Sequence, residues 1–97
     1  MTDATDYMAL VDAIEAQSGK ISRLGAGILA AAALEIASDS RSFARIFGVA
    51  HALVLREIAA LSVEGGYISI LQRDERTQRT KYALNASVVR LIEDTRR

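Results

Sequence analysis

The stretch SFARIFGVAHALVLREI, residues 42–58, places one glycine between two segments whose apolar residues recur at helical spacing. The first segment runs from Arg41 to about Phe47, and the second runs from Val49 to about Ser62. Gly48 lies between them and can adopt the positive φ angle of a tight turn without steric cost. We therefore expect a short helix, a glycine turn and a longer helix, with these residues facing inward: Phe43, Ala44, Phe47, Val54, Ile58 and Leu61.

Downstream of this stretch the pattern changes from helical to extended. Gly65-Gly66 is a helix breaker, and residues 67–71, YISIL, are rich in side chains that favour strands. A charged stretch from Arg73 to Thr80 follows, and residues 81–84, KYAL, indicate a returning strand. The pattern predicts a two-stranded hairpin whose basic tip covers about residues 72–81.

Upstream, two further helices are expected. Asp6 can cap a first helix over about residues 6–17, and an almost entirely apolar second helix runs from about Ile21 to Ala37. Because Gly25 and Gly27 disfavour a helix, either the second helix starts after them or another helix packs closely against them. Any residue of Ser38-Asp39-Ser40 can cap the helix that follows.

The whole chain of 97 residues is expected to form one domain, with its core at about residues 21–85 and a closing helix at about 86–94. Half of the residues are hydrophobic, as in globular proteins. The acidic N-terminus is unlike a signal peptide, and the apolar stretch 24–34 is too short to span a membrane. We expect a cytoplasmic protein without a membrane partner.

Charge is distributed unevenly although the net charge is zero. Residues 1–38 have a net charge of −3, whereas residues 39–82 hold seven Lys and Arg against five Asp and Glu, a net charge of +2. The distribution of charge is more informative about nucleic-acid binding than its sum. The basic side chains of the central region therefore mark a candidate surface for an anionic partner.

The order helix, short helix, glycine turn, longer helix and charged hairpin resembles the winged helix-turn-helix of bacterial regulators. Residues 73–84, RDERTQRTKYAL, are similar to the wing of MarR-type proteins, in which an Asp-x-Arg element, here Asp74 and Arg76, precedes a strand. The resemblance covers about residues 28–85. It implies a mainly α fold with a small β-hairpin, built as a three-helix core plus wing with flanking N- and C-terminal helices.

The resemblance further implies a DNA-binding transcriptional regulator. Helix 49–62 would enter the major groove as the recognition helix, and the basic wing at about 72–81 would reach the backbone or the minor groove. The residues placed near DNA by position are Ser40, Arg41, Ser42, His51, Ala52, Leu53, Leu55, Arg56, Arg73, Arg76, Thr77 and Arg79. Pairing of two copies through the terminal helices would form a homodimer that matches a palindromic site.

Other interpretations stay open. Ala52, Leu53 and Leu55 make the recognition-helix face apolar, which favours a winged-helix protein-protein interaction module as an alternative. A small-molecule effector between two subunits is a third possibility. His51 can instead cap a helix or face solvent, and the wing arginines can simply keep the hairpin soluble.

Catalytic and metal-binding functions are not expected. The chain has no cysteine, and its Asp and Glu residues show neither paired-carboxylate nor metal-ligand spacing. The segment Gly25-Ala26-Gly27 lacks the preceding strand and the following Lys-Ser/Thr of a phosphate loop. We expect no enzyme, no metal and no cofactor.

Overall fold

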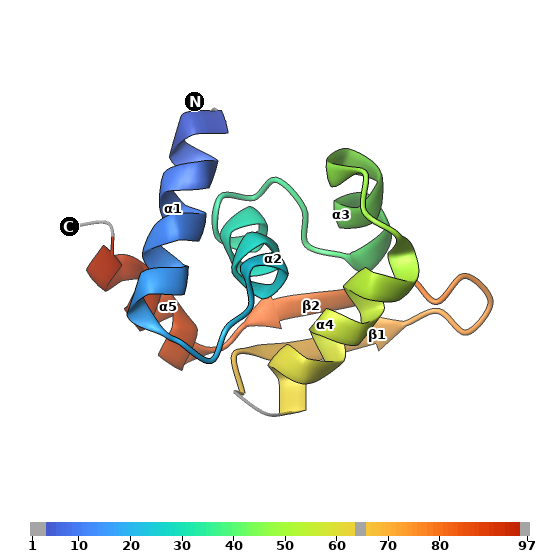
Figure 1. The fold of residues 1–97 in the computed structure, drawn as a ribbon. Helices are drawn as coiled ribbons and strands as arrows, with labels where there is room; N and C mark the ends of the chain where they lie inside the picture. The colour runs from blue at the N-terminus through green and yellow to red at the C-terminus, as the bar shows by residue number, and fades with distance from the viewer. Residues whose placement is uncertain (1–3, 64–65, 96–97) are drawn as a thin grey trace.

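The computed structural model describes residues 4–63 and 66–95, which form five helices and one antiparallel hairpin (Figure 1). The prediction of a mainly helical fold with a small hairpin is confirmed. The elements in order are α1 (Ala4–Gln17), α2 (Arg23–Ala33), α3 (Ser40–Phe47), α4 (His51–Val63), β1 (Ile68–Arg73), β2 (Thr80–Leu84) and α5 (Ala86–Thr95).

Helix α2 lies at the centre of the molecule and is buried continuously from Gly25 to Ala31 (Figure 1). Helix α1 packs along it, and α5 packs on α1 near the chain ends, while α4 and β2 also contact α2. This position explains why α2 is apolar nearly all round, because it has neighbours on most sides. The predicted inward-facing residues Phe43, Val54, Ile58 and Leu61 are buried in this core.

At Gly27 a side chain of α1 lies against the backbone of α2. The Tyr7 hydroxyl of α1 donates a hydrogen bond of 3.0 Å to the Gly27 carbonyl oxygen. The Tyr7 ring stacks on Phe47, which in turn stacks on Phe43, with ring centroids 4.9 and 4.5 Å apart. Gly25 and Gly27 both lie inside α2, so the helix does not start after them. The structure instead shows the other expectation, a close approach, and the neighbour at Gly27 belongs to the same chain.

Two predicted helix boundaries are wrong. Asp6 does not cap α1 but lies within its first turn. Helix α2 ends at Ala33 instead of Ala37, because Glu35 adopts a positive φ of 59° and the backbone N–H of Ile36 turns back to the Ala31 carbonyl. The chain then runs extended toward β2, where Asp39 forms an isolated bridge with Lys81.

The glycine turn between α3 and α4 is confirmed. Gly48 has a φ of 65° and donates its backbone N–H to the Ala44 carbonyl, which ends α3. Asp39 caps the other end of α3, because its Oδ1 accepts a 2.9 Å hydrogen bond from the backbone N–H of Ser42. Helix α4 begins at His51, two residues later than Val49, since Val49 and Ala50 complete the turn.

The predicted hairpin is also confirmed. Strand β1 begins at Ile68 instead of Tyr67 and extends to Arg73, and it pairs antiparallel with β2. The register pairs Ile70 with Tyr82 and Gln72 with Lys81, so that Leu71 is the extra residue of a β-bulge. The charged tip of the hairpin thus comprises residues 74–79.

None of the helices in the described ranges is both long enough and apolar enough to cross a bilayer. Helices α1 and α5 lie together at the end of the molecule opposite the hairpin tip (Figure 1). The pairing of two copies through these helices stays a prediction.

The close approach at Gly27 generates a stability test. A Cβ atom at this position would lie 2.7 Å from the Tyr7 hydroxyl oxygen but 4.0 Å from Tyr7 Cζ. Gly27→Ala should therefore displace the hydroxyl and break its hydrogen bond, which contributes about 1 kcal/mol. In a Tyr7→Phe background the clash is absent, and alanine is favoured over glycine in a helix by about 1 kcal/mol.

Urea unfolding measures the change in the free energy of unfolding that Gly27→Ala causes in each background. We expect this change to be at least about 1 kcal/mol more destabilising when Tyr7 is present than in the Tyr7→Phe background. Equal effects in the two backgrounds would contradict the packing described here.

Candidate nucleic-acid interface

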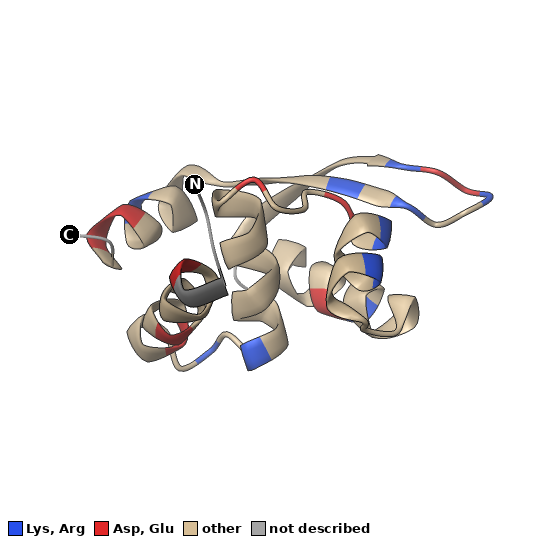
Figure 2. Cartoon of the chain, turned by 90° about the horizontal axis from the view of Figure 1, so that it is seen from above, with Lys and Arg blue, Asp and Glu red and all other residues tan. Residues whose placement is uncertain are grey.

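Most of the Lys and Arg positions of α3, α4 and the hairpin lie at one end of the molecule, together with acidic positions of the hairpin (Figure 2). Helix α1, at the other end, carries the acidic residues Asp6, Asp12 and Glu15. The acidic residues Asp12 and Glu15 are paired there with Arg23, and the end formed by α3, α4 and the hairpin also carries acidic residues, so the basic character of that end is an excess of Lys and Arg over Asp and Glu.

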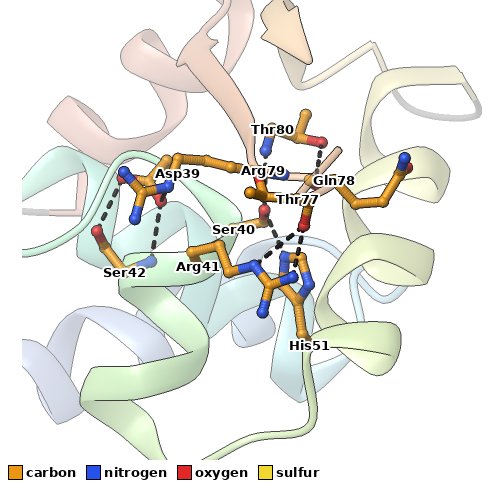
Figure 3. A network of polar contacts seen from close by, with 9 residues as sticks. All are labelled: Asp39, Ser40, Arg41, Ser42, His51, Thr77, Gln78, Arg79 and Thr80. Carbon is orange, nitrogen blue, oxygen red and sulfur yellow. Dashed lines mark hydrogen bonds and ion pairs between the residues drawn. The ribbon is translucent and has the colours of Figure 1, made fainter. Parts of the chain in front are cut away.

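The hydroxyl group of Ser40 joins the three elements of this end (Figure 3). It accepts a 2.9 Å hydrogen bond from the backbone N–H of Thr80 in β2, and its Oγ lies 2.8 Å from Nε2 of His51 in α4. Ser40 is completely buried. Its role near phosphates stays a prediction, and the hydroxyl would have to leave its buried position and both partners to contact DNA.

Two arginines connect the hairpin tip to α3 (Figure 3). Arg41 donates from Nε to the Thr77 carbonyl oxygen at 3.1 Å, and a second guanidinium nitrogen of Arg41 bonds the same oxygen. Arg79 Nε lies 3.5 Å from Asp39 Oδ1. Arg41, Thr77 and Arg79, which were predicted to contact DNA separately, are thus close together and fix where the tip lies relative to α3.

Asp74 shapes the tip itself. Its Oδ1 accepts hydrogen bonds from the backbone N–H groups of Arg76 and Thr77, at 2.8 and 3.0 Å, and these bonds lower the pKa of the Asp74 carboxyl group. Gln78 takes a left-handed φ of 62° to close the turn. Asp74 therefore contacts the backbone of Arg76, and the Arg76 side chain is exposed at the tip.

A hollow opens between α3, the start of α4 and the hairpin. It is lined by Arg41, Ala44, Arg45, Val49, His51 and Arg79. Arg45 was not among the predicted site residues, although it lies one helical turn after Arg41 and so shares its face of α3. Two arginines of α3 and one of the hairpin line this space, and arginine is a residue that binds phosphate groups. Arg41 and Arg79 also have the partners described above, Thr77 and Asp39.

The remaining predicted residues are divided between solvent and internal contacts. Ala52, Leu53 and Arg56 are exposed on α4, whereas Leu55 is only partly exposed. Ser42 donates from Oγ to Asp39 at 2.8 Å and supports the cap of α3. Arg73 donates from Nε to Thr80 Oγ1 at 3.3 Å along the hairpin.

Comparison with known proteins identifies no relative: no family model, curated protein or solved structure matches the chain. In the described part of the chain, no three His, Asp or Glu side chains form a group that could hold a metal ion.

The contact between His51 and Ser40 generates a pH prediction. A serine hydroxyl can donate one hydrogen bond while its oxygen accepts others, so Ser40, which accepts from Thr80, can also donate to an unprotonated Nε2 of a neutral His51 ring. Partial burial, and then Arg41, lower the pKa of His51 from 6.5, while Asp39 opposes this shift. The folded chain therefore binds this proton less readily than the unfolded chain.

The neutral His51 ring therefore stabilises the folded chain. This contribution is fully present above the unfolded-state pKa of 6.5 and is lost as pH falls through the lower folded-state pKa. We expect Tm to fall between about pH 7.5 and pH 5, and His51→Gln, whose amide oxygen can accept from Ser40, to remove most of that fall. His51 is the sole histidine, so little else titrates in this window. An unchanged pH dependence in His51→Gln would contradict the neutral His51–Ser40 bond.

Proposed function

We propose that this chain is a winged-helix domain that binds double-stranded DNA and acts as a transcriptional regulator. Helix α4 would be the recognition helix, and the hairpin of β1 and β2 would be the wing. The order of α2, α3, the Gly48 turn, α4 and the hairpin supports this assignment. The observation that carries the proposal is the basic hollow lined by Arg41, Arg45, His51 and Arg79.

The hollow suits one phosphate of a DNA backbone. Recognition helices place their N-terminal residues near the base edges, so that phosphates of the same groove lie beside the helix start. His51 is the first residue of α4, and Arg41 and Arg45 lie next to it on α3. An arginine can donate two parallel hydrogen bonds to one phosphate group.

The wing contributes positive charge at a defined position. Arg76 is exposed at the tip, and the Arg41–Thr77 and Arg79–Asp39 contacts hold the tip against α3. Because the tip is already held in the free protein, little conformational entropy is lost when α3, α4 and the wing contact one duplex together. The wing arginines would then neutralise phosphates and release counterions.

A second candidate function is a winged-helix module that binds a protein through the apolar face of α4. The observation that favours it is the exposure of Leu53, which is 47% accessible on this face. Such a contact would be insensitive to salt and lost on Leu53→Asp. DNA binding is preferred because the arginines from α3 and from the hairpin face the same hollow.

Fluorescence anisotropy with a labelled random duplex at several salt concentrations tests the proposal. We expect log affinity to fall linearly with log salt, and each of Arg45→Ala and Arg76→Ala to reduce the slope by about 0.9, the value for one phosphate contact. Arg90→Ala, on α5 at the opposite end, removes the same charge and serves as the matched control.

An unchanged slope and affinity for Arg90→Ala are part of the expectation. If no duplex binds at low salt, or if all three variants weaken binding equally, the proposed interface is wrong.

A further inference from the structure

The exposed face of α4 has almost no groups that can recognise a base. The exposed residues of this helix are Ala52, Leu53, Arg56, Ala59 and Val63. Among them, Arg56 alone has a side chain that forms hydrogen bonds. Apolar side chains in the major groove can contact only the thymine methyl group, whereas the other base edges are distinguished by hydrogen-bond donors and acceptors.

The other polar side chains of α4 already have partners inside the protein. His51 bonds to the buried Ser40, and Glu57 accepts a hydrogen bond from Ser22, the residue that caps α2. Ser62 donates from Oγ to the Ala59 carbonyl oxygen at 2.9 Å. A base contact by any of these three side chains would have to break an internal hydrogen bond.

The groups that suit phosphates are more numerous. Arg45 lines the hollow beside α4, and Arg76 lies at the wing tip. Arg41 and Arg79 also line the hollow, and each has guanidinium N–H groups beyond those that bond Thr77 and Asp39. Phosphate contacts position a protein on DNA but carry no sequence information. The side chains of this surface therefore suit contacts with the DNA phosphates more than contacts with the bases.

From these contacts we infer that the domain binds duplex DNA as a class, with little discrimination among sequences. The inference rests on the DNA binding of the proposed function and replaces regulation at one operator with binding to duplex DNA in general. Arg56, by bonding a guanine, is the single base-reading side chain of α4, and Ala52 and Leu53 add only contacts with thymine methyl groups. The partner is then any accessible duplex instead of one operator.

The expected discrimination has a definite size. One bidentate arginine–guanine contact changes affinity by about 5- to 150-fold. Proteins that recognise an operator prefer it over random DNA by about 10³- to 10⁷-fold. The two cases are therefore separable by measurement.

The test selects the tightest binders from a pool of randomised duplexes and compares the best selected duplex with the unselected pool by anisotropy at one salt concentration. We expect a ratio within about 150-fold. A ratio above about 1,000-fold overturns the inference but leaves DNA binding in place. Absence of binding to both duplexes overturns the proposed function, and this inference with it.

Two variants identify the source of any preference. Arg56→Ala should bring the ratio close to one and change affinity for the pool only by a few fold. Arg45→Ala, which removes the same charge from the hollow, should weaken binding to both duplexes equally and keep the ratio. A ratio that survives Arg56→Ala would show that another group recognises the bases and would overturn the assignment. Circular dichroism of both variants confirms that each is folded.

Discussion

The hydroxyl group of Ser40 connects α3 with the next helix, α4, and with the distant strand β2. Its partners are His51, 11 residues away at the start of α4, and Thr80, 40 residues away in β2. Since the hydroxyl is buried, removing it would leave the Thr80 N–H without this partner, which would lower the free energy of unfolding by about 1–3 kcal/mol. The orientation of the hairpin relative to α4 depends on this junction, and the proposed interface depends on that orientation.

Asp39, next to Ser40, adds to the junction in three ways. It caps α3, forms the ion pair with Arg79 and bridges Lys81 of β2 through its backbone. The bonds from Ser42 and the charge of Arg79 lower the pKa of this carboxyl group against the opposing effect of burial. Asp39 is therefore ionised at neutral pH, as an N-cap and an arginine partner require.

Those parts of the fold that depend on local chemistry could be predicted from the sequence. Gly48 signals its turn because it relaxes a local steric limit, and the change of pattern after Gly66 signals the hairpin. The end of α2 could not be predicted, because Ala32, Ala33 and Leu34 are all good helix formers. The helix ends there because the chain has to reach β2, which is a tertiary requirement expressed in the positive φ of Glu35.

The candidate site could likewise be predicted only where it depends on local features of the sequence. Exposed arginines such as Arg56 and Arg76 are recognisable from charge and position. The burial of Ser40 was not predicted, because its hydrogen bond to Thr80 joins residues 40 positions apart in the sequence. Arg45 was missed although its spacing from Arg41 was visible, since only the folded hollow shows that both face Arg79.

The claim that α3, α4 and the hairpin tip form one DNA-binding surface is tested most directly by nuclear magnetic resonance of the labelled chain titrated with duplex DNA. We expect the amide signals around Arg41, Arg45, His51 and Arg76 to shift together, while those of α1 and α5 stay unchanged. Shifts confined to α1 and α5, or no shifts at low salt, would contradict it.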